Sequence, residues 1–127
     1  MLKKIMVIED DPDIMEVLEY ILRSEGYEVI TSVDGEECAH LAEILPDLIL
    51  MDIRLKPPGQ NGDMICLRLK SAAETKCFPV ILLSAEHDLP AISRSCGADG
   101  YLSKPFDLAV LTDKVRHILT NRVPIKS

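Results

Sequence analysis

The stretch KIMVIEDDPD, residues 4 to 13, joins a short apolar run to a cluster of acidic residues. The run at 4 to 8 is almost continuously apolar, which is typical of a strand in a parallel sheet that helices cover on both faces. A helix-start signal follows at once. Asp11 is a favoured N-cap, Pro12 suits the first helical position, and Asp13 is stabilised at the positive end of the helix dipole. The stretch therefore predicts a strand that leads directly into a helix.

The same strand–helix unit recurs along the chain. Apolar residues repeat at helical spacing over 14 to 22, and Gly26 stands where a left-handed residue commonly ends a helix. A last helix of this kind is expected over 108 to 119. Two further strands buried on both faces are expected at 47 to 51 and 79 to 84, weaker strands at 27 to 31 and 99 to 103, and weaker helices at about 35 to 45, 62 to 71 and 88 to 96.

This alternation predicts the fold class. Parallel strands joined by right-handed crossovers place the helices on both faces of one sheet, so we expect an α/β fold with a doubly wound, five-stranded parallel sheet. A chain of 127 residues is long enough for one domain with a single well-filled core. We expect that domain to span residues 3 to 121, followed by a short tail, RVPIKS, at 122 to 127.

Composition narrows the possible functions. The net charge of −7 disfavours nucleic acid as the main direct partner. No segment approaches the ~18 apolar residues of a membrane span, and we expect no signal peptide before the first strand. The four cysteines are widely scattered without a C-x-x-C pair, which favours reduced thiols. We therefore expect a cytoplasmic protein that does not contact the membrane.

Acidic residues stand at the ends of two predicted strands. Glu9 and Asp10 follow the first strand, and Asp52 follows the third. Like charges a few ångströms apart repel by about 4 kcal/mol at an effective dielectric near 20. In a doubly wound sheet, sites form beyond the carboxyl ends of the strands, so these residues converge if the two strands are neighbours. Hard oxygen ligands without thiols or imidazoles suit Mg²⁺, although solvated loop acids remain an alternative.

The ends of the last two predicted strands add a hydroxyl and a cation. Ser84 ends the fourth strand, and Lys104 follows the fifth in the sequence K-P-F. A lysine, a hydroxyl and metal-binding carboxylates at one sheet edge can bind phosphoryl oxygens. Asp52 could then attack phosphorus and form an acyl phosphate. Taken alone, Lys104 would be an ordinary surface lysine; its place beside Ser84 and Asp52 favours a phosphoryl site.

Four sequence segments at the predicted strand ends, together with the spacing between them, match the pattern of a known protein family over essentially the whole chain. The chain resembles a response-regulator receiver domain of two-component signalling, as found in single-domain chemotaxis-type and sporulation-relay-type regulators. The resemblance implies a flavodoxin-like sheet of order 2-1-3-4-5. The segments that carry it are IED at 8 to 10, LILMD at 48 to 52, VILLSA at 80 to 85 and GADGYLSKPF at 97 to 106.

The resemblance also implies roles for individual residues. Asp52 would be the phosphoacceptor, assisted by Lys104 and Ser84. Asp10 and Asp52 would bind Mg²⁺ directly, and Glu9 would act mainly through water. A further metal ligand would be the main-chain carbonyl of Arg54, and the peptide bond before Pro105 would be cis.

The same resemblance implies a conformational switch and protein partners. Ser84 would move to the phosphoryl group and Tyr101 would rotate inward, although a half-buried strand tyrosine is an alternative for Tyr101. The phosphodonor would be a sensor histidine kinase or a histidine phosphotransfer protein. The downstream target would bind the face formed by the fourth helix, the fifth strand and the fifth helix. The chain would be a monomer or a phosphorylation-dependent dimer.

Two features near the site are particular to this chain. Gly62, which should open the third helix, stands ten positions after Asp52, whereas many family members place it eight positions on. The longer loop contains Pro57-Pro58-Gly59, which should stiffen it. Arg54 and Glu86 should rim the opening of the site, where they could pair or remain separately solvated.

Three other functions compete with the receiver. A haloacid-dehalogenase-type phosphatase also uses an aspartyl nucleophile with Mg²⁺, but it normally has a second acid two residues later, where this chain has Arg54. An interaction module that has lost phosphorylation would not need Asp52, Lys104 and Ser84. A flavodoxin-like electron carrier needs a phosphate-binding loop after the first strand, where Asp11 would repel a flavin phosphate.

Overall fold

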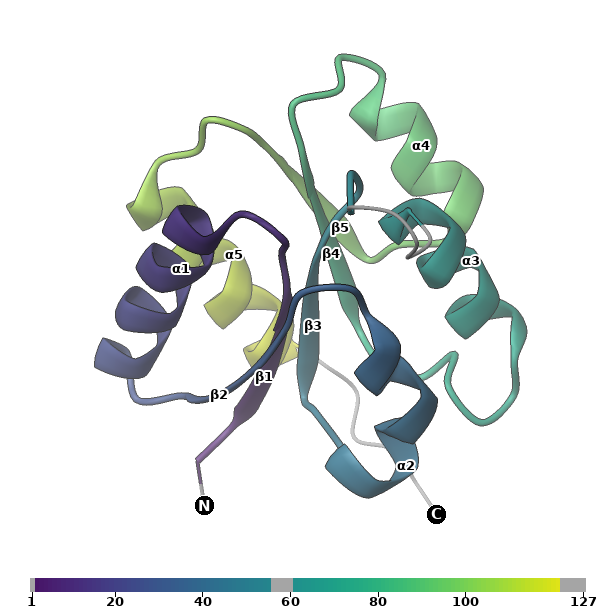
Figure 1. Ribbon diagram of the computed structural model, residues 1–127, viewed down its shortest axis with the longest axis horizontal. Coiled ribbons are helices and arrows are strands. Elements are labelled where there is room, and N and C mark those ends of the chain that lie inside the picture. Colours follow the sequence, from purple (N-terminus) through teal and green to yellow (C-terminus); the bar gives the residue numbers. More distant parts are fainter. Residues whose placement is uncertain (1, 56–60, 122–127) are drawn as a thin grey trace.

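Five parallel strands form one sheet with helices on both faces (Figure 1). The structure, a computed structural model, describes residues 2–55 and 61–121. The strand order is β2-β1-β3-β4-β5, which confirms the predicted fold class and sheet order. The strands are β1 (Lys4–Ile8), β2 (Glu28–Ser32), β3 (Leu48–Asp52), β4 (Val80–Ser84) and β5 (Gly100–Ser103). Four of them, β2 to β5, begin one residue later than predicted, and Asp52 is the last residue of β3.

The helices divide between the two faces of the sheet. Helices α1 and α5 cover one face, and α2, α3 and α4 cover the other (Figure 1). Because the strands are buried on both faces, their alternate side chains fill two separate apolar cores, one under each helix layer. The helical elements are α1 (Pro12–Ser24), η1 (Glu36–His40), α2 (Leu41–Ile44), α3 (Gly62–Ser71), α4 (Leu89–Cys96) and α5 (Leu108–Asn121).

The ends of α1 follow the predicted signals. The Asp11 carboxylate accepts hydrogen bonds from the backbone N–H groups of Asp13 and Ile14, so it is the N-cap. Pro12 is the first helical residue, where its missing N–H costs nothing. Gly26 follows the helix with φ +93°, a left-handed conformation that favours glycine.

The helix expected at 35 to 45 is different in the structure. A 3₁₀ helix, η1, covers Glu36–His40, and only the single turn of α2 is α-helical. None of the residues of η1 is buried, and within α2 only Leu41 is buried. Cys38, Leu41, Ala42 and Leu45 do recur at helical spacing, but of these only Leu41 is fully buried and Leu45 is 62% exposed. Helices in proteins depend on burying an apolar face, and this segment buries too little of one to form a longer helix.

Gly62 brings the start of α3 against the end of β3. A Cβ atom at this position would lie 2.1 Å from the carbonyl oxygen of Asp52, so no other residue fits without a backbone shift. The Gly62 N–H donates to the carbonyl of Ile53 over 2.8 Å. The glycine predicted to open the third helix is therefore required for that close approach. The predicted stiff loop at 57–59 and the predicted tail at 122–127 lie outside the described residues.

The structure also bears on the expected reduced thiols and on the expected lack of a membrane span. The four cysteines have free thiols, with Cys66 and Cys96 buried between α3 and α4. Among residues 2–55 and 61–121, no helix is long and apolar enough to cross a membrane.

Candidate functional site

The predicted site residues gather at one edge of the sheet because four neighbouring strands end there. Ile8 of β1 is paired with Met51 of β3, Asp52 with Leu83 of β4, and Ser84 with Ser103 of β5. The residues that end or directly follow these strands therefore lie side by side. They are Glu9 and Asp10 after β1, Asp52 at the end of β3, Ser84 at the end of β4 and Lys104 after β5.

Three carboxylates converge at this edge. One oxygen from each of Glu9, Asp10 and Asp52 lies within 4.8 Å of the others. Glu9 and Asp52 are buried, with exposed fractions of 1% and 4%, whereas Asp10 is partly exposed. Buried carboxylates at this spacing repel one another, and an ion with several oxygen ligands would relieve the repulsion. The donor set contains only oxygen at this point, which fits Mg²⁺.

Lys104 supplies the opposing charge. Its Nζ lies 2.7 Å from Oε1 of Glu9 and 3.3 Å from Oδ1 of Asp52. Its backbone N–H donates to the carbonyl of Ser84 over 2.8 Å, which ties the loop after β5 to the end of β4. The peptide bond between Lys104 and Pro105 is cis, as the resemblance implied. The closest carboxylate to Lys104 is Glu9, a pairing that strand-end spacing alone did not predict.

The ionisation of this cluster reflects its crowding. Burial raises the pKa of Glu9 to about 7, and the adjacent Asp52 adds to that increase, whereas the hydrogen bond from Lys104 opposes it. Burial by itself lowers the pKa of Lys104, but the hydrogen bond to Glu9 and the charge of Asp52 more than offset it, so the pKa is raised. One lysine therefore faces more negative charge than it can neutralise.

Ser84 and the rim of the site are connected by Glu86. The Ser84 hydroxyl oxygen accepts a hydrogen bond from the Glu86 N–H over 3.1 Å, and Ser84 is buried. The Glu86 carboxylate in turn lies 2.5 Å from the Arg54 guanidinium, so the two predicted rim residues do pair. The Arg54 side chain is 70% exposed, which limits the strength of this ion pair.

Tyr101 lies on β5, three residues before Lys104. It is half-buried, is paired in register with Leu82, and packs against the core cluster under α3 and α4. Lys114 of α5 donates from Nζ to the Tyr101 carbonyl over 3.0 Å, and its Nζ lies 5.3 Å from the centre of the Tyr101 ring. Sequence reasoning missed Lys114. Its place one helical turn from Val110 and Ile118 gave no sign of a contact with β5.

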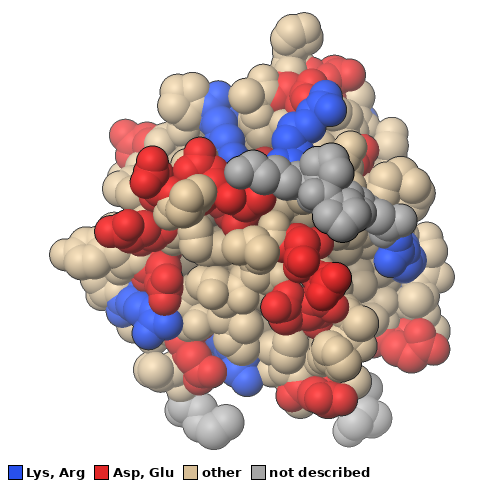
Figure 2. All heavy atoms as spheres, in the orientation of Figure 1, with Lys and Arg blue, Asp and Glu red and all other residues tan. Residues whose placement is uncertain are grey.

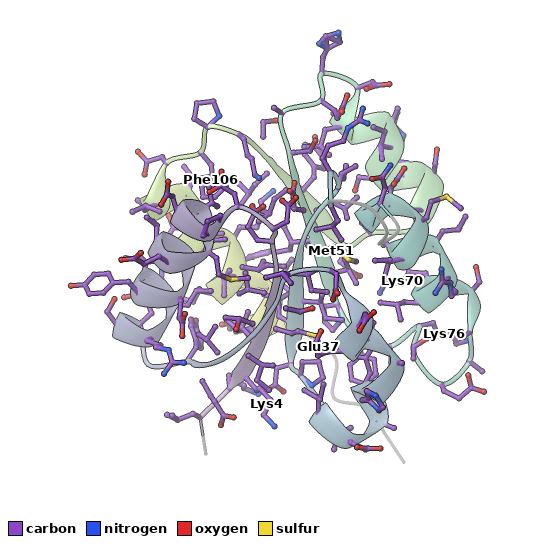
Figure 3. The ribbon with its side chains drawn as sticks, in the orientation of Figure 1. Lys4, Glu37, Met51, Lys70, Lys76 and Phe106 are labelled. Atoms are coloured by element: carbon purple, nitrogen blue, oxygen red, sulfur yellow. The ribbon has the colours of Figure 1, made fainter. Side chains whose placement is uncertain are left out.

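A groove beside Lys104 was also missed. It has a volume of about 550 Å³ and lies between α1 and the loop that joins β5 to α5. Phe106 lies near the N-terminal end of α1 (Figure 3). Val17 and Leu108 also line it and are 47% and 38% exposed, which is high for apolar side chains in amphipathic helices. Helical periodicity indicates which apolar residues face a core, but it does not show that two such faces leave a gap between them.

A family comparison identifies this arrangement. Residues 5–116 match the model of the family described as response regulator receiver domain. The chain belongs to that family. Receiver domains of this kind are phosphoacceptors with an acidic pocket, here formed by Glu9, Asp10 and Asp52, and they are not conventional enzymes. Both the functional class and the family resemblance drawn from the sequence are confirmed, and the phosphatase alternative is not supported.

Individual relatives agree with this assignment. The receiver domain is 39% identical to the phosphate regulon transcriptional regulatory protein PhoB of Rhizobium meliloti (strain 1021), with 98% of this chain and 55% of that protein covered. The chain spans about half the length of the curated relatives it matches. A signal receiver domain of a histidine kinase from Syntrophus aciditrophicus has a TM-score of 0.84 at 31% identity, covering 98% of this chain and 97% of that one.

A third relative bears on the metal. The receiver domain of the sensor histidine kinase PA1611 from Pseudomonas aeruginosa PAO1 was solved with a magnesium ion coordinated in its active site cleft. It has a TM-score of 0.81 at 30% identity and covers 95% of this chain and 100% of that chain. The acidic cluster of the present receiver domain has the oxygen donors that such an ion requires.

Proposed function

We propose that this receiver domain accepts a phosphoryl group on Asp52 and transmits the signal through a conformational switch. One observation carries the assignment. The Asp52 carboxylate is buried at the end of β3, within 4.8 Å of two further carboxylates and 3.3 Å from the Lys104 amine. A nucleophile, a metal-binding cluster and a fixed cation are thereby combined at one point, as phosphoryl transfer requires.

Each residue has a separate role in the proposed reaction. An oxygen of Asp52 attacks phosphorus, and the bond from phosphorus to the donor breaks as the acyl phosphate forms. Lys104 holds a positive charge against the phosphoryl oxygens, and the Ser84 hydroxyl donates a hydrogen bond to one of them. Asp10, Asp52 and the Arg54 carbonyl would bind Mg²⁺ directly, with Glu9 acting through water. When bound, the ion neutralises negative charge on the carboxylates and on the phosphoryl group.

The phosphodonor in this proposal is a protein that carries a phosphohistidine. Receiver domains work with histidine kinases, and a histidine phosphotransfer protein would serve equally. The apolar groove next to Lys104 supports a protein donor, because acetyl phosphate or another small anion has no use for the exposed apolar surface around Val17 and Phe106. The small Ala85 beside the same groove leaves room for the donor to approach.

The proposed output follows the sequence-based expectations. Phosphorylation draws Ser84 toward the site, Tyr101 turns inward, and the face formed by α4, β5 and α5 changes its packing for a downstream protein. Such a domain acts as a monomer or a phosphorylation-dependent dimer in the cytoplasm, without direct contact with nucleic acid or membrane. The half-buried position of Tyr101, between the core and Lys114, supports a residue that can move.

Phosphorylation by acetyl phosphate tests the assignment of Asp52. Intact-mass spectrometry should detect one added phosphoryl group in the presence of Mg²⁺ and almost none in the presence of a chelator. The variant Asp52→Asn should remain unmodified, because an amide is a poor nucleophile. Asp113→Asn is the matched control, since Asp113 lies on α5, far along the chain from Asp52, and pairs with Arg116. Full phosphorylation of Asp52→Asn would overturn the assignment.

A further inference from the structure

One lysine on α5 contacts the strand that carries the proposed switch residue. Lys114 donates from Nζ to the Tyr101 carbonyl over 3.0 Å, and the same Nζ lies 5.3 Å from the centre of the Tyr101 ring. A cation within about 6 Å of a ring centroid is attracted by the negative face of the ring. Lys114 therefore interacts with both the backbone and the side chain of Tyr101.

The Lys114 ammonium is anchored on backbone atoms of β5. Tyr101 packs against the core cluster under α3 and α4, whereas α5 covers the other face of the sheet (Figure 1). Because β5 is an edge strand, the Lys114 side chain can reach past it to the Tyr101 ring. Its stem lies over Gly100, where a Cβ atom would be 3.8 Å from Lys114 Cδ. The backbone of Gly100 and Tyr101 stays in place when a side chain rotates, and so does an amine that is bound to it.

No carboxylate competes with the ring for this ammonium. No ion pair joins Lys114 to another residue in the part of the chain that the structure describes. Acidic residues outnumber Lys and Arg by 21 to 14, and acidic side chains predominate on the face shown in Figure 2, so such a pair is not short of candidates. The neighbouring Asp113 is paired with Arg116 instead. Without a carboxylate to draw it away, the ammonium stays over the ring.

We propose that Lys114 is a positioning residue of the switch, which holds Tyr101 in its half-buried position until Asp52 is phosphorylated. This inference rests on the proposed function. When Ser84 moves to the phosphoryl group, the Tyr101 ring turns toward the space that Ser84 leaves on β4. The Lys114 amine remains on the Tyr101 carbonyl, so the ring moves away from it and the contact is lost. Lys114 thereby stabilises the unphosphorylated arrangement relative to the switched one.

The expected size of the effect follows from the strength of the contact. A cation over a ring at a partly exposed site shifts an equilibrium by about two- to fivefold. A ligand that binds only the switched arrangement has an apparent affinity that is reduced by the fraction of molecules in that arrangement. Removing the Lys114 ammonium should therefore increase the affinity for beryllofluoride, which mimics the phosphoryl group, by about the same two- to fivefold factor.

Two readouts test the role of Lys114 in the full chain. In protein with ¹³C-labelled tyrosine rings, Lys114→Met should move the Tyr101 ring signal of the unphosphorylated protein toward its position in the complex with Mg²⁺ and beryllofluoride. The same variant should bind beryllofluoride more tightly, a gain that a loss of stability would not produce. Lys114→Arg keeps a cation over the ring and should behave as the unmodified protein. An unchanged ring signal in Lys114→Met, or an equal or weaker affinity, would overturn the proposal.

Two control variants separate the ring contact from other effects of Lys114. Arg116→Met removes the same charge from an exposed position on α5 and should change neither readout; an equal gain in affinity would overturn the proposal. In a Tyr101→Leu background, Lys114→Met should alter the affinity little, and an equal gain there would also overturn it, because no ring remains. If beryllofluoride shifts no amide across 84–106 in the unmodified protein, the switch itself is refuted. If only the Lys114 variants fail, the proposed function stands without this positioning residue.

Discussion

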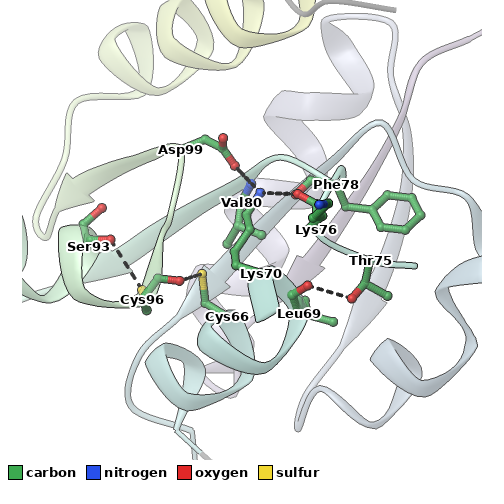
Figure 4. A network of polar contacts seen from close by, with 10 residues as sticks. All are labelled: Cys66, Leu69, Lys70, Thr75, Lys76, Phe78, Val80, Ser93, Cys96 and Asp99. Atoms are coloured by element: carbon green, nitrogen blue, oxygen red, sulfur yellow. Dashed lines mark hydrogen bonds and ion pairs between the residues drawn. The ribbon is translucent and has the colours of Figure 1, made fainter. Parts of the chain in front are cut away.

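Two partly buried lysines, one at each end of the sheet, have opposite surroundings. Lys104 at the carboxyl ends of the strands is 18% exposed and faces the carboxylates of Glu9 and Asp52. Lys70 at the end of α3 is 14% exposed and contacts one carboxylate, that of Asp99, and the carbonyls of Lys76 and Phe78 (Figure 4). Lys70 has as many acceptors as it has donors, and one of them balances its charge.

The difference separates a structural site from a functional one. The Asp99 carboxylate also accepts the Val80 N–H over 2.8 Å, so the network around Lys70 is satisfied and ties α3 to β4 and to the loop after α4. At the other end, Lys104 contacts the carboxylates of Glu9 and Asp52, and Asp10 lies beside them, so one lysine opposes three carboxylates and a bound cation would relieve their repulsion. A satisfied network holds the fold together, whereas an unbalanced one is prepared to bind an ion and a phosphoryl group.

The largest expected effect concerns signalling through Lys104. Lys104→Ala should still allow some phosphorylation but should abolish the response of the α4–β5–α5 face, because the charge that connects the phosphoryl group to the loop after β5 is gone. Amide spectra with and without beryllofluoride, a phosphoryl mimic, provide the measurement. The unmodified protein should show shifts across 84–106 and the variant should not. If the unmodified protein shows none, the proposed switch is wrong.

The next largest effect concerns stability at Lys70. Lys70→Met keeps most of the side-chain volume but removes the donor to two carbonyls and to Asp99. Of these acceptors the Phe78 carbonyl is partly buried, and leaving such a group unpaired should cost about 1 kcal/mol. Urea unfolding should show a loss of that size, while the extent of phosphorylation at saturating acetyl phosphate stays unchanged. Lys76→Met is the control, since only the backbone carbonyl of Lys76 belongs to the network. Equal losses in both variants would contradict the structural role of Lys70.

A substitution at Asp52 should raise the free energy of unfolding, by no more than the substitution at Lys70 lowers it. With a chelator present, Asp52→Asn should raise the free energy of unfolding by about 1 kcal/mol, because it removes repulsion from two carboxylates at the loss of one attraction to Lys104. Added Mg²⁺ should stabilise the unmodified protein more than the variant. Chemical unfolding with and without Mg²⁺ measures both. If the variant is less stable than the unmodified protein in chelator, the carboxylates at this site do not repel one another as strongly as proposed.

The smallest effect concerns the lifetime of the phosphoryl group, which Arg54 and Glu86 at the opening of the site should influence. The pair formed by Arg54 and Glu86 should slow the water that attacks the acyl phosphate, but an exposed ion pair contributes only about 0–1 kcal/mol, so the phosphoryl lifetime should change at most several-fold. The lifetime is measured in Arg54→Ala, Glu86→Ala and the double variant. Each single change should shorten it, and the double change should add little more. Additive effects would mean that the two residues act separately.

The residues of the functional site could be predicted from the sequence because the topology of a parallel sheet determines where they lie. In a parallel sheet the carboxyl ends of the strands share one edge, so residues that end or follow the strands at 4–8, 47–51, 79–84 and 99–103 must meet there. The structure brings Glu9, Asp10, Asp52, Ser84 and Lys104 together as this rule requires. The pairing of Arg54 with Glu86 was accessible for the same reason, since each lies two residues beyond a strand end.

Other features escaped prediction because they depend on contacts across the molecule. The sequence by itself determined the alternation of strands and helices and the cap at Asp11, since each follows from local spacing. That position 62 accepts only glycine was decided by the tertiary structure, because the clash is with the Asp52 carbonyl at the end of β3. Only the tertiary structure decided that α1 and the loop after β5 would leave a groove beside Lys104 and that Lys70 would join Asp99 from 29 residues away. Such contacts are set by how helices pack once the sheet has formed, and no local pattern records the distance between two packed faces.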